Sequence, residues 1–195
     1  FEGVRLVMAG AIFDRTSAAR AVLLGADAIQ MGTAYLAVDE AVRTGALARV
    51  YQEQILAARP GGTIILGEAV GLRIRSLRSP KTEALARVER RFGVDGADEH
   101  ALRRTIEETA TGTLLIAARG VRTPGGEPLD EQVCREEGQF MSGTAAGCID
   151  RVSTLAELHR EVMTAPTLTL PVMAAPAAPP SRGVSPAGPA RPRER

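Results

Sequence analysis

The sequence is poor in aromatic residues and histidine, and its charges almost cancel. Aromatic residues make up 3% of the 195 residues and tryptophan is absent, so stacking platforms for nucleic-acid bases are not expected. The 24 basic and 23 acidic residues leave a formal net charge of +1, whereas a protein that binds a phosphate backbone needs a basic face. We therefore expect no nucleic-acid partner.

Long apolar runs and a signal peptide are also missing. No stretch reaches the roughly 18 apolar residues that a membrane helix requires, and the N-terminus has no basic segment followed by an apolar one. These absences predict a cytoplasmic protein with no membrane partner. In a reducing compartment Cys134 and Cys148 are expected to be free thiols, and nothing around them favours the alternative of a redox pair. No metal site is predicted.

Two short apolar runs near the N-terminus predict parallel strands. Residues 4–9 and 26–31 show no polar alternation, as in strands that are buried on both faces. Two strands alone leave unpaired backbone groups and an uncovered face. Because the chain also begins abruptly at Phe1, we expect it to be a fragment of a longer protein.

A helix is expected after each of these strands. The first covers residues 15–24, where Asp14 is placed to cap its N-terminus. The second runs over residues 34–59 with a break near Gly45. Strand, helix, strand and helix in this order predict a βαβ unit.

The rest of the chain changes character twice. Residues 61–165 predict a mostly helical cap or subdomain, with a strand at 63–66 and a strand or extended arm at 71–78. The helices expected there cover residues 81–92, 98–118, 129–149 with an interruption near Gly138, and 154–163. Residues 166–195 hold 8 of the 12 prolines and are predicted to be a disordered Ala/Pro-rich tail or a linker.

Two small-residue loops are the strongest functional signal. Gly10 and Ala11 follow the first strand, and Gln30, Met31, Gly32 and Thr33 follow the second. Small residues let backbone N–H groups approach an anion closely, and a following helix adds the positive end of its dipole. The pair of loops therefore indicates a phosphate site, although either glycine alone would also suit a tight turn.

Residues 6–36 resemble the end of the barrel in the nitronate monooxygenase family, which includes the flavin-dependent enoyl-acyl carrier protein reductases. The family pattern is an Ala-Gly-Gly-Ile loop, a helix, and a later Gly-Ala-Asp-x-Val-Gln-Met-Gly-Thr segment. This sequence departs from the pattern at Ala11, where the second glycine is expected. More loosely, residues 62–85 and 126–149 resemble reductase-like members of polyketide and polyunsaturated fatty-acid synthesis.

The resemblance implies an α/β fold: the last two βα units of a TIM (β/α)8 barrel at residues 1–60, followed by the helical subdomain. It implies FMN as cofactor, with its phosphate held by the residues of the two loops, and NAD(P)H as a candidate reductant. The residues implied to bind the cofactor are Gly10, Ala11, Gln30, Met31, Gly32 and Thr33. The catalytic histidine of many relatives would lie upstream, so His100 and His159 are expected to be surface residues and the catalytic residues stay unknown.

Two reactions fit this resemblance: oxidation of an alkyl nitronate, and reduction of an enoyl thioester. The substrate is then a small molecule or an acyl thioester, and an acyl carrier protein is a candidate partner. Arg73, Arg75 and Arg78 suit either such an acidic partner or a solvated strand edge. Two rival functions remain open: a phosphate-binding barrel enzyme without flavin, and a non-catalytic carrier-docking or scaffold segment.

Overall fold

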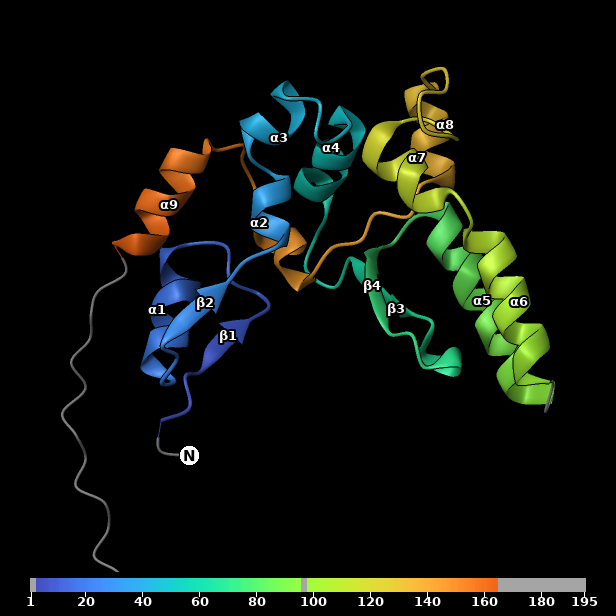
Figure 1. Cartoon of the computed structure of the whole chain (residues 1–195), viewed down its shortest axis with the longest axis horizontal. Coiled ribbons are helices and arrows are strands. Elements are labelled where there is room, and N and C mark those ends of the chain that lie inside the picture. The colour runs from blue at the N-terminus through green and yellow to red at the C-terminus, as the bar shows by residue number, and fades with distance from the viewer. Residues whose placement is uncertain (1–2, 96–97, 165–195) are drawn as a thin grey trace, which may run out of the picture.

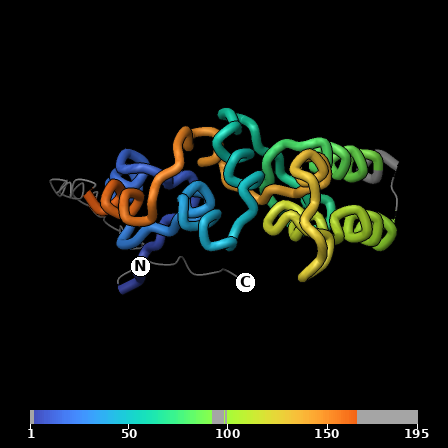
Figure 2. Tube along the Cα trace, turned by 90° about the horizontal axis from the view of Figure 1, so that it is seen from above, coloured from blue at the N-terminus to red at the C-terminus, as the bar shows by residue number. Residues whose placement is uncertain are grey.

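The elements form an arch, with the N-terminal strands at one end and a pair of long helices at the other (Figure 1). The structure, a computed structural model, describes residues 3–95 and 98–164. Seen from above, the same elements follow one another along an elongated body (Figure 2). The predicted tail at residues 166–195 lies outside the described residues.

The predicted βαβ unit is present at the N-terminal end. Strands β1 (Val7–Ala9) and β2 (Ala28–Gln30) pair in parallel, and helix α1 (Arg15–Leu23) connects them. Asp14 caps α1 as predicted, because the Ser17 backbone N–H donates to its carboxylate at 2.7 Å. Both strands are shorter than the predicted apolar runs, because they pair only from Val7 with Ala28 to Ala9 with Gln30.

The predicted helix over residues 34–59 is wrong in its continuity, because the structure has three helices there. They are α2 (Thr33–Leu36), α3 (Asp39–Arg43) and α4 (Arg49–Ala57). The first break falls at Val38, which is extended and bridges to Ser153. The second falls at Gly45, where a φ of 72° confirms the predicted interruption. The break at Val38 thus accompanies a contact with Ser153, which lies far along the chain and which the sequence around Val38 does not indicate.

Residues 63–77 form a second, antiparallel sheet. Strand β3 (Thr63–Leu66) pairs with β4 (Ile74–Leu77), and Thr63 lies opposite Leu77. A 3₁₀ turn, η1 (Glu68–Val70), joins them. The structure thus decides between the two alternatives for residues 71–78 in favour of a strand.

The helical region has more breaks than the sequence predicts. Helix α5 (Pro80–Asp95) matches the predicted one, but the helix expected over 98–118 is divided into α6 (Glu99–Ala110) and α7 (Thr113–Arg119). Gly112 between them has a φ of 77°, a conformation that ends a helix.

The helix predicted over 129–149 is wrong beyond residue 137. Helix α8 (Glu131–Glu137) ends at Gly138, as expected. The chain then extends along β4, where Met141 bridges to Ser76, before the 3₁₀ segment η2 (Thr144–Cys148). Pairing with a strand about 65 residues away overrides the local helical pattern.

The last described helix packs back on the first unit. Helix α9 (Leu155–Met163) has the predicted position, with Thr154 and Glu157 forming a capping box. Its Leu158 and Val162 are buried against Ala18 and Ala21 of α1, so α1 and α9 lie side by side in Figure 1. Among the described residues, no helix combines the length and hydropathy needed to cross a membrane.

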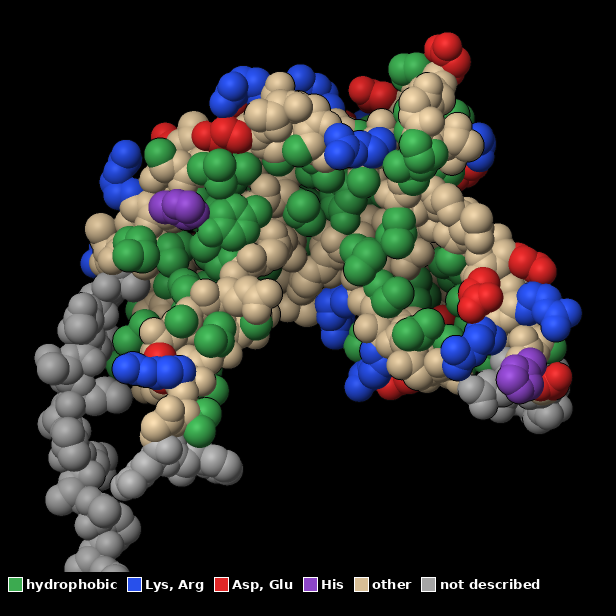
Figure 3. Space-filling view, viewed as in Figure 1, with side chains coloured by type: hydrophobic (Ala, Val, Ile, Leu, Met, Phe, Trp, Pro, Cys, Tyr) green, Lys and Arg blue, Asp and Glu red, His purple; other side chains and the backbone are tan. Residues whose placement is uncertain are grey.

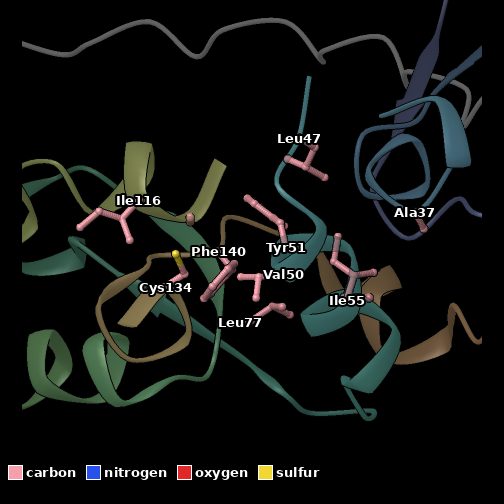
Figure 4. Close-up of a cluster of buried hydrophobic side chains, with 11 residues drawn as sticks. Ala37, Leu47, Val50, Tyr51, Ile55, Leu77, Ile116, Cys134 and Phe140 are labelled. Atoms are coloured by element: carbon pink, nitrogen blue, oxygen red, sulfur yellow. The ribbon is translucent and has the colours of Figure 1, made fainter. Parts of the chain in front are cut away.

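A central hydrophobic core joins the two halves of the arch (Figure 4). Phe140 is completely buried, and its ring meets Tyr51 edge to face with centroids 5.1 Å apart. Residues before and after position 60 share this core, because Ile55 of α4 and Leu77 of β4 both belong to it. The division into 1–60 and 61–165 therefore remains a sequence prediction, and it does not coincide with a gap in packing.

Hydrophobic side chains also gather on the face seen in Figure 3, over the central part of the arch. Val4, Leu6 and Val7 of the N-terminal segment are 49–67% exposed. The β1–β2 pair thus has one packed face and one face that the described residues leave uncovered. This is the arrangement expected of a small parallel sheet without further strands.

Candidate functional site

The two predicted phosphate loops lie side by side. In the parallel register Ala9 is the partner of Gln30, so Gly10 and Met31 leave the sheet at the same edge. Carboxyl ends of parallel strands that meet in this way form the usual ligand edge of an α/β protein. The structure therefore brings together the residues that the sequence analysis singled out.

The first loop has an unusual backbone. Gly10 has a φ of 92° and Ala11 a φ of 55°, and Ala11 is the one non-glycine residue with positive φ in the described part of the chain. A side chain in this left-handed region costs about 1–2 kcal/mol. The backbone conformation therefore explains why glycine suits this position, and alanine keeps the conformation at an energetic cost.

Gly32 in the second loop has a different character. Its φ of −123° is accessible to any residue, and a Cβ built at this position meets no atom within 4 Å. Packing in the described structure therefore does not explain the glycine. Open space above an unsubstituted backbone is what a closely approaching ligand requires.

The side chains of Gln30, Met31 and Thr33 take separate directions. Gln30 is exposed, whereas Met31 packs against the core cluster that contains Ile12. Thr33 Oγ1 accepts a hydrogen bond from the Gly143 backbone N–H at 2.8 Å. Thr33 thus ties the loop to a segment 110 residues later, and the hydrogen of its own hydroxyl stays available for a ligand.

A pocket of about 340 Å³ lies directly beside this loop. Sequence reasoning did not place residues from β4 or from the 141–143 segment here, because only the tertiary fold brings them to the loop. The lining residues are Gly32, Thr33, Leu36, Arg75, Met141, Ser142 and Gly143.

Tyr51 of α4 holds the 141–143 segment in place. Its hydroxyl donates to the Met141 carbonyl at 2.5 Å, and the Ser142 backbone N–H donates to the Arg75 carbonyl at 3.1 Å. Burial raises the pKa of Tyr51 to about 12, although the neighbouring Ser142 hydroxyl by itself lowers this pKa. Tyr51 therefore stays a neutral donor at physiological pH.

The three arginines of the basic row have different environments. Arg73 pairs with Glu68 at 3.3 Å and Arg78 with Glu83 at 2.5 Å, and both arginines are exposed. Exposed pairs of this kind fit the solvated strand edge and contribute little stability. Arg75 is half-buried instead and is one of the residues that line the pocket.

The histidines and cysteines add no reactive centre to this loop. His100 and His159 are both exposed, as predicted, and His159 Nε2 lies 2.9 Å from the Tyr35 hydroxyl. Both cysteines are free, with Cys134 buried and Cys148 exposed. Burial is the main cause that raises the pKa of the Cys134 thiol, which makes it a poor nucleophile.

Comparison with known proteins gives a structural match and no sequence match. Neither a protein-family model nor a curated protein matches the chain. The fold is similar to FabK from Thermotoga maritima, with a TM-score of 0.63, 27% identity, and coverage of 83% of this chain and 43% of that one. A methionine-to-alanine mutant of the same protein matches with a TM-score of 0.55 and 26% identity over 83% and 40% of the two chains.

This chain therefore spans less than half the length of the solved chains that it matches. The described residues form a mixed α/β structure that corresponds to a part of FabK. The predicted α/β class is confirmed at this level.

Proposed function

We propose that this chain is part of an FMN-dependent oxidoreductase of the enoyl reductase and nitronate monooxygenase type, and that it supplies the FMN-phosphate site. The main support is the pair of adjacent loops at the carboxyl edge of β1 and β2, with a left-handed turn in one and an uncrowded glycine in the other. The likeness to FabK, an enoyl-acyl carrier protein reductase, supports the same class.

The residues present fit a phosphate group. Gly10, Ala11 and Gly32 expose backbone at the loop edge, and Thr33 adds a hydroxyl donor. Each hydrogen bond from such donors to a charged oxygen contributes about 1.5–3 kcal/mol. Gln30 and Met31 complete the proposed site, Gln30 through an exposed side chain and Met31 through its backbone.

In this proposal the bound flavin supplies the electron transfer, and the protein positions it and controls access. The likeness to FabK favours reduction of an enoyl thioester by NAD(P)H over oxidation of a nitronate. The substrate class is then an acyl thioester, with an acyl carrier protein as the proposed partner.

The visible absorption spectrum of the protein, expressed from its complete reading frame, tests this proposal. We expect flavin absorption, release of FMN identified by its mass, and loss of the absorption on anaerobic addition of NAD(P)H. A colourless protein that also fails to take up added FMN would contradict the proposal. Binding of an acyl carrier protein without flavin would then favour the scaffold function, and binding of a small phosphorylated substrate the flavin-free barrel.

A further inference from the structure

The pocket beside Gly32 contains hydrogen-bond donors and no acidic side chain. It lies between α2, β4 and the 141–143 segment, and its walls include Leu36 and Met141. None of its lining residues is an aspartate or a glutamate. A pocket with apolar walls and one arginine suits a ligand that combines an anionic group with an organic body.

Arg75 has an environment unlike that of the other arginines. In the described part of the chain, Arg75 and Arg135 are the arginines that are only partly exposed. Arg135 pairs with two carboxylates, those of Glu53 and Glu131. The Arg75 guanidinium donates to the neutral hydroxyl of Thr63 at 3.0 Å, and no ion pair of Arg75 occurs among the described residues. A half-buried cation without a counter-ion favours binding of an anion.

Two hydroxyl groups of the same pocket also have unused donor capacity. Thr33 Oγ1 accepts from Gly143, which leaves its hydrogen free for a ligand oxygen. Ser142 is 5% exposed, and its hydroxyl lies close enough to the Tyr51 hydroxyl to lower the pKa of Tyr51, yet among the described residues it is the one buried side-chain polar group without a hydrogen bond of good geometry. Buried polar groups are normally hydrogen-bonded, so this orphaned hydroxyl points to a partner supplied by a ligand.

We propose that this pocket binds a phosphate ester, that Arg75 supplies the positive charge, and that Thr33 and Ser142 donate to the phosphate oxygens. The apolar walls accommodate the organic part of the ester. This proposal rests on the function proposed above and extends it. It adds Arg75 and Ser142 to a site that the sequence resemblance limits to the two loops.

Two phosphate esters have the required chemistry. One is FMN, whose phosphate the neighbouring loop is proposed to hold. The other is the phosphopantetheine group that carries acyl thioesters. Each has a counterpart without phosphate, riboflavin and pantetheine respectively, so the contribution of the phosphate can be measured separately for each source.

The experiment measures the affinities of these four compounds for the flavin-free form of the complete protein by calorimetry. The variants are Arg75→Gln, Ser142→Ala and the matched control Arg78→Gln. Arg78 follows the same strand but is exposed and paired with Glu83. Thermal unfolding of each variant shows whether it is folded, and Ser142→Ala tests the pocket even if Arg75→Gln is unstable.

We expect Arg75→Gln to weaken binding of one phosphate ester about 10- to 100-fold, as for the loss of a charge-assisted hydrogen bond. Binding of the counterpart without phosphate stays unchanged, and Arg78→Gln has no effect. A loss confined to FMN identifies the flavin as the source, and a loss confined to phosphopantetheine identifies the thioester carrier.

Equal affinities in wild type, Arg75→Gln and Ser142→Ala for both phosphate esters would overturn the proposal. A wild-type protein that binds neither FMN nor riboflavin would contradict the proposed function instead. In that case the comparison of phosphopantetheine with pantetheine still decides whether the pocket recognises a phosphate, and equal binding of these two compounds overturns the pocket proposal.

Discussion

Replacement of Ala11 with glycine tests the left-handed turn at the first loop. Alanine at a φ of 55° costs about 1–2 kcal/mol compared with its preferred conformation, whereas glycine adopts this conformation freely. Glycine also increases the entropy of the unfolded chain, which lowers the free energy of unfolding by about 0.5–1 kcal/mol. We therefore expect Ala11→Gly to raise the free energy of unfolding by about 0.5–1 kcal/mol.

Urea unfolding followed by circular dichroism measures this change. The matched control is Ala19→Gly, which makes the same chemical change in the interior of α1. There glycine is unfavourable, and we expect a loss of about 1 kcal/mol. Opposite signs for the two substitutions support the assigned backbone conformation. If Ala11→Gly destabilises the protein as much as Ala19→Gly, the left-handed turn at Ala11 is wrong.

Further predictions concern the segments that support the pocket. Tyr51→Phe removes the donor to the Met141 carbonyl and is expected to lower the free energy of unfolding by about 1–2 kcal/mol; an unchanged urea midpoint would contradict this. Because burial raises the pKa of Tyr51 from 10.0 to about 12, its stabilising effect is present below pH 10 and is lost as pH rises through 12, so pH titration of stability should show a fall that Tyr51→Phe reduces. Gly67→Ala places a Cβ 2.0 Å from the Leu72 carbonyl oxygen, whereas the same change at Gly71, with nearly the same φ, meets no atom within 4 Å. Thermal melting should therefore show a larger loss for Gly67→Ala, and equal losses would exclude this close contact.

Local signals were sufficient for the elements whose causes are local. The Asp14 cap, the helix over residues 154–163 and the break near Gly45 were each recognisable in the sequence, and the structure has a helix start, a helix and a helix end at these places. Capping depends on residues within one helical turn. The sequence therefore predicts α1, α9 and the break before α4 well.

Long-range pairing explains the predictions that failed. Val38 bridges to Ser153 and Met141 bridges to Ser76, and both contacts interrupt segments with a helical pattern. Nothing near these residues signals a partner that lies 65 or more positions away. Tertiary contacts override helix propensity in such segments.

In the candidate site, too, the parts that depend on local sequence were predictable and the parts that depend on tertiary contacts were not. Gly10 and Gly32 follow apolar runs and were recognised from this local pattern, and the parallel register then brings their loops together. Arg75 was recognised as part of a basic row, but its half-buried position in the pocket that Thr33 also lines depends on the fold of β4. Ser142 gave no signal, because a serine in a helical pattern does not indicate a buried, unpaired hydroxyl.

The most direct test of the proposed FMN site is the affinity of Gly32→Ala for FMN, measured on the complete protein by fluorescence titration. The added Cβ meets no atom within 4 Å in the structure, so we expect the variant to fold, with only the small loss of melting temperature that follows from alanine at the N-cap of α2. A phosphate that approaches the Gly32 backbone would be displaced, and overpacking of about 1–3 kcal/mol corresponds to a loss of roughly 5- to 150-fold. Unchanged FMN affinity in the folded variant would contradict the account, because it would show that no ligand approaches this loop closely.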